Sequence, residues 1–580
     1  MAMVNPLEGY SSIEKQTKEA ATQFPPTIRV MYLKMYNTLT KQLEAFVPTN
    51  PQQVSFYSCG PTVYDDAHIG NFRSFLAADL LRRWIESPLC TLKNLDGSLH
   101  TQKRTVVQIM NITDVGHMTD DENADGAGQD KMEVAAKRIE QAKKTGKIPL
   151  DEGIDPQDPF AIARYYETRF KQDAIELGLT VAIQAQRDPS LMPRATDNIQ
   201  NMKIVIEQLL NDGHAYPAGD PGSRAVYFDV QRFKPYGQLS GNTIDQLKDG
   251  AGGRTDDTNT KQKHHPADFL LWKEDATHKM KWTSPKIPNQ EQWGMGYPGW
   301  HIECTAMALA RLADKGLEGA RKNHAQIDLH SGGEDNIFPH HECEIAQSCC
   351  FTGQVDTNSP TFAKHWFHPR FLKVEGQKMS KSKGTMYTLR DLKARGINPA
   401  AIRLELIKTH YRANADFSMQ GLKDSTRTIE RWRKFVDAGK GGEIGTMNKF
   451  VRDAVTQAMH DDLNIAGALG AINKWIKDTP NPTQADAELF EVFDGFLGVL
   501  SLKQLEQPSS TSSTSSTSSI ALYQPGVTPS PEIESLLIAR RDAKAAKDFA
   551  AADAIRDQLK SMGLSIMDKP AGQVEVAPLN

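Results

Sequence analysis

Two β-rich runs on either side of an apolar helical pattern constrain the fold of this chain more than any other feature. Val54–Ser58 is the first run, and it ends at Cys59-Gly60-Pro61. Thr105–Met110 is the second, and Asn111-Ile112-Thr113-Asp114 follows it. Between them, apolar residues recur at helical spacing, namely Phe72, Phe75, Leu76, Leu80 and Trp84. Strand, helix and strand within about 60 residues indicate a βαβ unit, so we predict an α/β fold with a parallel sheet.

The sheet is predicted to be split by a large insertion. Gln326–Leu329 returns to the pattern of a buried strand and ends at Ser331-Gly332-Gly333. Before it come a polar stretch at 117–160, helical patterns at 160–178 and 195–213, and short strand-like runs among glycine-rich loops over 215–290.

The chain changes character beyond residue 420. Apolar residues at helical spacing predict a helical region that runs to about residue 502. A serine- and threonine-rich run at 508–519 then reads as a linker, because its side chains bury too little apolar area to offset the entropy of ordering. Two further helices are predicted at 532–547 and 548–562, with Asp548 as N-cap and Gly563 after the end.

Composition excludes several classes of protein. Lysine and arginine total 68 against 72 aspartate and glutamate, so the chain is no bulk polycation. It has no apolar run of about 18 residues, and its start lacks an apolar core with a basic leader. Six cysteines in 580 residues do not make a disulfide scaffold. We therefore expect a cytoplasmic protein with reduced thiols and no membrane contact, and we ask which cysteines bind metal.

The first chemical motif is Cys59–Asn71, which lies where a strand gives way to a helix. Helix N-terminal amides at that position favour phosphates. His68 and Asn71 can donate to phosphate oxygens, and Gly70 lets a nucleotide approach the backbone. The four residues 68–71 taken alone fit equally well a turn in which Asn71 caps the helix.

The second motif is the lysine-rich run Lys378–Gly384, which follows a predicted hairpin at Lys373–Gln377. A mobile loop with several lysines can neutralise the charge that grows on departing pyrophosphate. A solvated basic loop is the alternative for this run taken alone.

The third motif consists of Gly299–Cys304 and Phe338–Glu344. Pro339 suits the first turn of a helix, and His340 and Glu344 would then share one helical face, as two ligands of one metal must. Thiolates with an imidazole and a carboxylate suit Zn²⁺, although Cys304 and Cys343 could instead be buried small apolar residues. The candidate ligands are Cys59, Cys304, His340, His341, Glu342, Cys343 and Glu344.

Together these motifs resemble those of class I aminoacyl-tRNA synthetases, and specifically of the cysteinyl-tRNA synthetase family. The likeness runs from about residue 29 to the C-terminus and includes His68-Ile69-Gly70-Asn71, Lys378-Met379-Ser380-Lys381-Ser382 and the two segments of the third motif. It implies a Rossmann-type catalytic domain split by an insertion, followed by a helical bundle and a small C-terminal domain. The implied domains are an N-terminal extension (1–28), the first catalytic half (29–185) with a polar insertion near 117–160, an inserted connective domain (186–290), the second catalytic half (291–370), a linking fold with the lysine loop (371–420), a tRNA-binding bundle (421–504), a linker (505–530) and an anticodon-side domain (531–580).

The resemblance also implies the site residues. The family's zinc ligands fall on Cys59, Cys304, His340 and Glu344, with one zinc per chain, whereas His341 and Glu342 match family positions that do not ligate. Cys343 is a local departure that should point away from the 340/344 face. His68, Gly70 and Asn71 are implied to bind ATP, Lys378 and Lys381 to follow the transferring charge, and Gly60, Thr113 and Trp300 to line the amino-acid pocket. A second departure is Gly116–Asp120, which stands where the family has an acidic loop ending in lysine.

The implied reaction uses ATP with Mg²⁺, L-cysteine and tRNA(Cys), in a chain that is a monomer like most of its family. Cysteine would attack ATP to give cysteinyl-adenylate, and zinc would select the substrate by its thiolate. Basic helix residues could contact tRNA phosphates, or simply be solvated: Arg427, Arg431, Arg433, Lys434, Arg540, Arg541, Lys544 and Lys547. Two alternatives stay open: a paralogous cysteine ligase that acts on an amino sugar, and a non-catalytic relative that binds tRNA or zinc.

Overall fold

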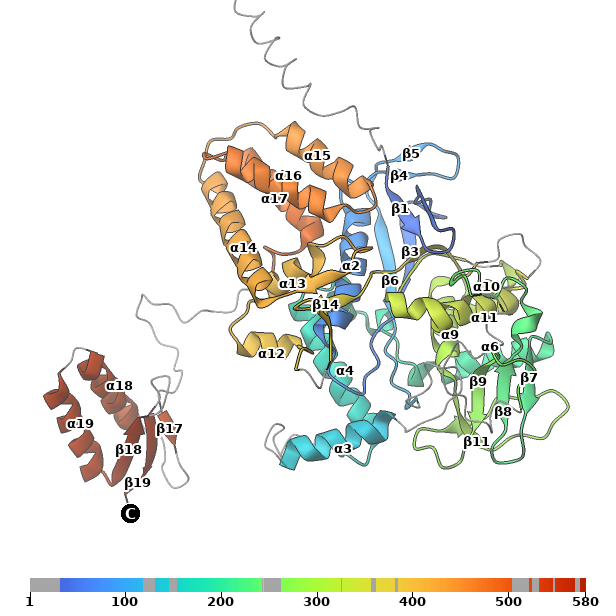
Figure 1. Cartoon of the computed structure of the whole chain (residues 1–580), viewed down its shortest axis with the longest axis horizontal. Helices are drawn as coiled ribbons and strands as arrows, with labels where there is room; N and C mark the ends of the chain where they lie inside the picture. The colour runs from blue at the N-terminus through green and yellow to red at the C-terminus, as the bar shows by residue number, and fades with distance from the viewer. Residues whose placement is uncertain are drawn as a thin grey trace, which may run out of the picture. The chain divides into compact units, whose positions relative to one another are not determined.

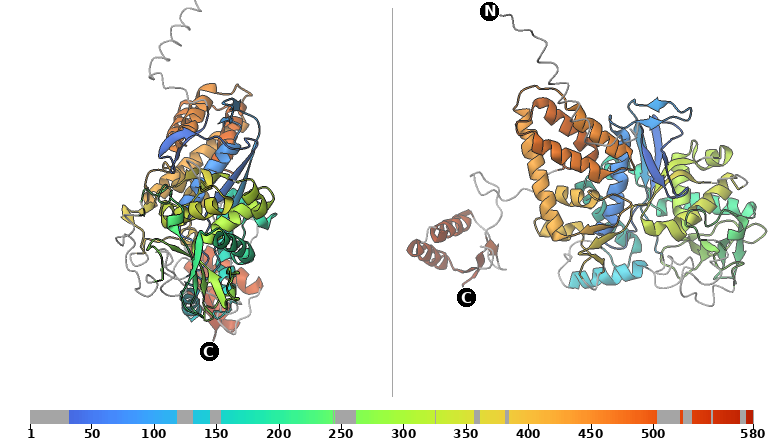
Figure 2. Two further views of the ribbon diagram at one scale, coloured as in Figure 1. Left: turned by 90° about the vertical axis from the view of Figure 1, so that its right-hand side faces the viewer. Right: turned by 45° about the horizontal axis from the view of Figure 1, so that its top comes forward.

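The computed structural model divides the chain into two units, Met1–Leu505 and Glu506–Asn580, which are described separately (Figures 1 and 2). The structure describes residues 32–117, 131–144, 154–242, 244, 262–324, 326–355, 361–380, 384–502, 521–523, 531–545, 548–568 and 574–579. The predicted extension at 1–28 and the serine- and threonine-rich run at 508–519 lie outside these residues, as do parts of the 117–160 stretch. Within them, no helix combines the length and apolar character that crossing a bilayer requires.

The first unit contains a four-stranded parallel sheet in the order β13–β12–β3–β6. β3 (Gln53–Ser58) and β6 (Thr105–Met110) come from one part of the sequence, and β12 (Ile327–Ser331) and β13 (Ala363–Phe367) from another. β3 pairs directly with β12, so the two halves join at the middle of the sheet. The predicted parallel sheet, divided by a long insertion, is confirmed.

Helix α2 (Ile69–Glu86) connects β3 to β6 and completes the βαβ unit. The five apolar residues that predicted it are all buried, and each buried side chain of this size contributes about 1.5–3 kcal/mol. Two buried charges tie α2 to α13 (Pro399–Ile407) and the turn after it. Asp79 pairs with Arg403 at 2.6 Å, and Arg73 donates to the carbonyls of Thr409 and His410 at 2.9 Å.

The insertion between β6 and β12 builds a second, antiparallel sheet in the order β10–β11–β9–β8–β7 (Figure 1). The predicted helices appear as α4 (Pro159–Glu176) and α6 (Ile199–Asn211). The polar stretch also contains a helix that the sequence did not predict, α3 (Lys131–Lys144), whose Met132, Ala135, Ala136 and Ile139 are buried. The other elements are α5 (Thr180–Ala185), β7 (Ala215–Ala218), β8 (Ala225–Phe228), β9 (Phe269–Glu274), β10 (Trp282–Thr283), β11 (Met295–Pro298), α9 (Trp300–Leu312) and α10 (Gly316–Lys322).

Residues 363–502 contain the last strand of the parallel sheet, a small sheet and a helical bundle. The predicted hairpin is formed by β14 (Leu372–Val374) and β15 (Gln377–Lys378), with both turn residues, Glu375 and Gly376, at positive φ. The bundle confirms the predicted helical region and appears in orange in Figure 2. Its helices are α14 (Met419–Lys440), α15 (Lys449–His460), α16 (Ile465–Asp478) and α17 (Gln484–Leu497), preceded by α12 (Leu389–Ala394), α13 and β16 (Ala415–Phe417). Two short hairpins precede α2 and β6, β1 (Lys34–Asn37) with β2 (Gln42–Ala45) and β4 (Leu92–Lys93) with β5 (Leu99–His100).

The second unit has its own core, in which Leu537, Leu559 and Val576 are buried. Helices α18 (Pro531–Ala545) and α19 (Phe549–Ser561) accompany a three-stranded sheet in the order β17–β19–β18. Asp548 caps α19 by accepting a hydrogen bond from the amide of Ala551, and Gly563 has φ of 75°, as predicted. The strands are β17 (Ala521–Tyr523), β18 (Leu564–Asp568) and β19 (Val574–Pro578).

Candidate active site

Four side chains from distant parts of the sequence converge on one buried point. The ligand atoms of Cys59, Cys304, His340 and Glu344 all lie within 4.8 Å of one another. The two sulfur atoms are 3.9 Å apart, and His340 Nε2 lies 2.9 Å from Glu344 Oε1. Two thiols, an imidazole and a carboxylate at this spacing form a donor set that a zinc ion prefers.

The parallel sheet and two helices behind it bring these four residues together. Cys59 follows the C-terminal end of β3, and its amide donates to the carbonyl of Ser331 at the end of β12. Cys304 is on the first turns of α9, which begins directly after Gly299. Glu344 lies on the first turn of α11 (Glu342–Thr352), and His340 lies just before that helix.

Helical backbone leading into α11 resumes at Pro339. In the short helical segment 337–341, Phe338 alone has an extended backbone, and α11 follows from Glu342. His340 and Glu344 lie four positions apart and are in contact at 2.9 Å, as the predicted shared helical face requires.

A second donor set overlaps the first. Cys59 and Glu344 also lie within 4.8 Å of His330 and His341, with His341 Nε2 3.2 Å from the sulfur of Cys59. His330 Nε2 is 2.7 Å from Glu344 Oε2, and His341 Nδ1 is 2.7 Å from His368 Nε2. Sequence reasoning missed His330, although it stands on a buried strand one residue before the Ser-Gly-Gly turn that was noticed.

The buried cluster strongly perturbs protonation. Burial raises the pKa of the Cys59 thiol well above its ordinary value, whereas the hydrogen bond with Cys59 lowers the pKa of Cys304 against the effect of burial. Burial opposes ionisation of Glu344, but the nearby His330 and His340 lower its pKa to about 2. In turn, Glu344 and Cys304 overcome burial and raise the pKa of His340 to about 10. The attraction between opposite charges therefore outweighs burial, and it favours an ionised Glu344 carboxylate beside a protonated His340 ring.

A cleft of about 290 Å³ opens next to the cluster and is lined by residues from all three sequence motifs. Trp300 stacks on the His340 ring, with centroids 4.4 Å apart, and also lines the cleft, so it contacts both the cluster and the cleft. The lining of the cleft includes Cys59, Gly60, His68, Gly70, Asn71 and Trp300. Thr113 does not line it: this residue is buried, and its Oγ1 accepts a hydrogen bond from Asn111.

Position 60 must be glycine, because its backbone lies very close to the backbone of Asn111, which follows the end of β6. Its amide donates to Asn111 Oδ1 at 2.8 Å, and a Cβ at this position would lie 1.8 Å from the carbonyl oxygen of Asn111. No side chain fits between two backbones at that distance.

His68 and Asn71 form a capping box at the start of α2. His68 Nδ1 accepts from the Asn71 amide at 3.2 Å, and Asn71 Oδ1 accepts from the His68 amide at 3.0 Å. Capping is therefore present, although the N-cap residue is His68 rather than Asn71, and both residues also line the cleft. Because Nδ1 is an acceptor, the neutral ring carries its hydrogen on Nε2 and can donate to an anion from that atom.

The lysine loop is only partly described. Lys378 is exposed and does not line the cleft, whereas Met379 does, and its methyl group packs against Gly70. Lys381 lies outside the described residues, so its role stays a prediction.

Cys343 belongs to neither donor set. Its sulfur lies 3.4 Å from the hydroxyl oxygen of Tyr236, on the side of the helix away from His340 and Glu344. The predicted orientation of Cys343 is confirmed.

Comparison with known proteins agrees with this geometry. Residues 45–427 match the family model for class I tRNA synthetase catalytic domains of the cysteine type, and residues 529–574 match the cysteinyl-tRNA ligase anticodon binding domain. A cysteine--tRNA ligase of Salinibacter ruber is 36% identical, over 93% of this chain and 97% of that protein. The corresponding protein of Chlorobaculum tepidum is 33% identical, over 93% and 98%. The chain therefore belongs to the cysteinyl-tRNA synthetase family of class I aminoacyl-tRNA synthetases.

Proposed function

We propose that this chain joins L-cysteine to tRNA(Cys) at the expense of ATP, through a cysteinyl-adenylate. The observation that carries the proposal is the convergence of Cys59, Cys304, His340 and Glu344 beside a cleft lined by His68 and Asn71. A thiol-binding centre next to a helix N-terminus that favours phosphate places an amino acid and a nucleotide side by side.

Cys59, Cys304, His340 and Glu344 would hold one Zn²⁺, and the donor set fits that ion. When bound, the metal supplies a soft Lewis acid that takes a substrate thiolate in preference to the hydroxyl of serine. His330 positions Glu344 by its 2.7 Å contact with the second carboxylate oxygen, and Trp300 fixes the His340 ring by stacking. Gly60 lets the substrate approach the end of β3. Thr113 supports Gly60 indirectly, because it accepts a hydrogen bond from Asn111, which in turn accepts one from the Gly60 amide.

The chain needs no nucleophile of its own for the first step. The carboxylate of cysteine attacks the α-phosphorus of ATP, and the bond from that phosphorus to the departing pyrophosphate breaks. His68 and Asn71 bind the phosphates, Gly70 leaves room for the nucleotide, and Lys378 and Lys381 neutralise the pyrophosphate with Mg²⁺ as it leaves. The terminal ribose hydroxyl of tRNA then takes the cysteinyl group.

The finer organisation follows the domain boundaries given above. The bundle at 421–504 and the small domain at 531–580 bind tRNA, and the linker at 505–530 joins them. The protein acts as a cytoplasmic monomer.

Cysteine-dependent exchange of pyrophosphate into ATP tests the proposal most directly. We expect exchange with cysteine to exceed exchange with serine by at least about 1000-fold in zinc-loaded protein, because several kcal/mol separate the two ligands. Removing the metal should bring the two rates close together. Equal selectivity with and without metal would contradict the proposed mode of recognition.

The acceptor requires its own test, because a paralogous ligase would use an amino sugar. We expect charging of tRNA(Cys) and no transfer to glucosamine derivatives. The matched domain at 529–574 supports tRNA as the acceptor. Transfer to an amine without charging would favour the alternative, and absence of exchange altogether would favour a non-catalytic relative.

A further inference from the structure

One lysine reaches the cleft from outside all the motifs considered so far. Lys131 is the first residue of α3, is partly buried and lines the same cleft as Cys59, His68 and Trp300. Its Nζ lies 5.5 Å from the ring centre of Tyr64 and 5.9 Å from that of Trp300. The ammonium group is therefore held between two aromatic faces at the junction of the metal cluster and the nucleotide side of the cleft.

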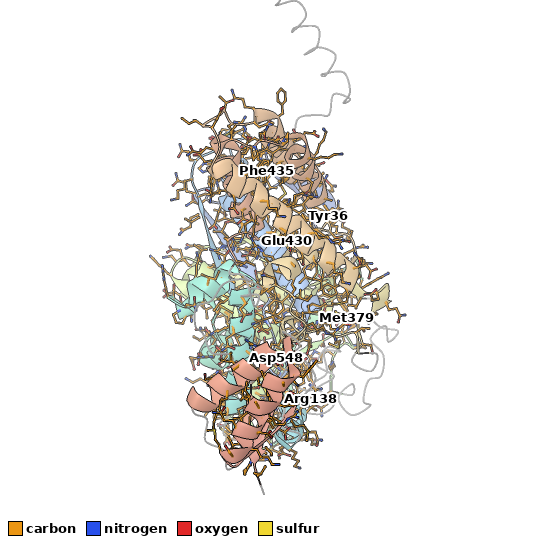
Figure 3. The ribbon with its side chains drawn as sticks, turned by 90° about the vertical axis from the view of Figure 1, so that its left-hand side faces the viewer. Tyr36, Arg138, Met379, Glu430, Phe435 and Asp548 are labelled. Atoms are coloured by element: carbon orange, nitrogen blue, oxygen red, sulfur yellow. The ribbon has the colours of Figure 1, made fainter. Side chains whose placement is uncertain are left out.

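The backbone of α3 fixes this lysine in place. The Lys131 amide donates to the carbonyl of His117 at 3.0 Å, and the buried side of α3 packs into the core. About two turns further on, Arg138 pairs with Asp65 of the loop before α2 at 2.7 Å. Arg138 and Met379, which lines the cleft, are labelled in Figure 3. Helix α3 is thus bound to the same 59–71 loop that carries His68.

No carboxylate among the described residues forms an ion pair with Lys131. The acidic residues of the lining are Glu334 and Asp335, of which Glu334 pairs with Arg370. Two aromatic faces stabilise an ammonium by about 1 kcal/mol each but do not neutralise it. A partly desolvated cation in this position attracts an anion that enters the cleft.

We propose that Lys131 contacts a non-bridging oxygen of the α-phosphate while cysteinyl-adenylate forms. The inference rests on the proposed function and adds a residue that acts on the reacting phosphorus rather than on the leaving group. As the carboxylate oxygen bonds to phosphorus and the bond to pyrophosphate breaks, negative charge grows on the non-bridging oxygens, and Lys131 stabilises it. The step transfers no proton to or from the lysine.

The variant Lys131→Met removes the charge and keeps the length of the side chain. We expect the rate of adenylate formation in a single turnover, at saturating ATP and cysteine, to fall about 30- to 100-fold, because stabilisation of growing charge affects the transition state more than the ground state. The KM for cysteine and the zinc content should change less than about twofold, since Lys131 is no ligand in either donor set. Lys131→Arg should restore at least about a third of the rate, because it keeps a cation at this position.

The matched control is Lys137→Met, on the exposed side of the same helix. It should react like the wild type, and all variants should unfold at the wild-type temperature within about 2 °C. A Lys131→Met enzyme with an unchanged rate, or with a raised KM alone, would overturn the inference. So would an Arg variant as slow as the Met variant. These results concern Lys131 only, whereas wild-type protein without cysteine-dependent exchange would overturn the proposed function itself.

Discussion

The two ends of the active-site cleft are built in different ways. At one end, Cys59, Cys304, His340 and Glu344 are buried, and each is delivered by a strand, a helix or the turn joined to it. At the other end, His68 and Asn71 lie at the start of α2, and the lysine loop is partly exposed. An amino acid that must be distinguished from a near-isostere requires rigid, desolvated donors. A nucleotide and its leaving group require access, so their contacts come from helix ends and loops.

The largest effect should come from the buried end. Cys304→Ser keeps the side-chain volume but removes a thiolate, so we expect zinc content to fall below about one tenth per chain and exchange to fall at least about 100-fold. Metal analysis and pyrophosphate exchange check both. A variant that retains its zinc would show that His330 and His341 can serve as ligands in place of Cys304. The cluster would then not be the rigid donor set that distinguishes it from the nucleotide end.

A substitution at the nucleotide end of the cleft should lower the reaction rate without loss of zinc. His68→Asn retains a good N-cap but removes the ring donor, so we expect exchange to fall about 100-fold while α2 and the zinc content persist. Single-turnover rates measure the loss of activity, and metal analysis measures the zinc content. If His68→Asn were fully active, capping would be the only role of this residue.

Gly60 joins the two ends, and its replacement should affect stability. Gly60→Ala places a methyl group against the backbone of Asn111, so we expect a loss of about 2 kcal/mol in the free energy of unfolding. Urea denaturation measures it. Gly470→Ala, where a Cβ meets nothing within 4 Å, is the matched control and should be neutral or stabilising.

The smallest effect is expected at Cys343, a buried cysteine outside the cluster. Cys343→Ser should cost about 1 kcal/mol or less and leave zinc content and selectivity for cysteine unchanged, because the only described hydrogen-bond partner of its sulfur is the hydroxyl of Tyr236. This variant is also the control for Cys304→Ser. Loss of metal from it would show that the cluster extends further than its donor atoms indicate.

Much of this arrangement could be predicted from the sequence, because it depends on local patterns. The strands at 53–58 and 105–110 and the cap at Asp548 follow from side-chain periodicity and from hydrogen bonds within a few residues. The convergence of Cys59 with Cys304 depends on pairing between β3 and β12, which periodicity does not determine, so the ligand set rested on family resemblance.

The features that the sequence did not reveal are helix α3 and the role of His330. The polar composition of 117–160 concealed α3, whose buried side consists of four modest apolar residues, and with it the position of Lys131. His330 is one of 16 histidines, and only its distance from Glu344 reveals its contact with the cluster.

The 285 positions between Cys59 and Glu344 also matter while the protein is being made. A ribosome that adds about 5–20 residues per second needs roughly 15–60 s to cover that interval. Throughout it, the nascent polypeptide exposes a thiol whose eventual neighbours have not been synthesised. Until translation has passed α11, the cell's reducing and chaperoning machinery must therefore protect the Cys59 thiol against oxidants and against premature binding of metal.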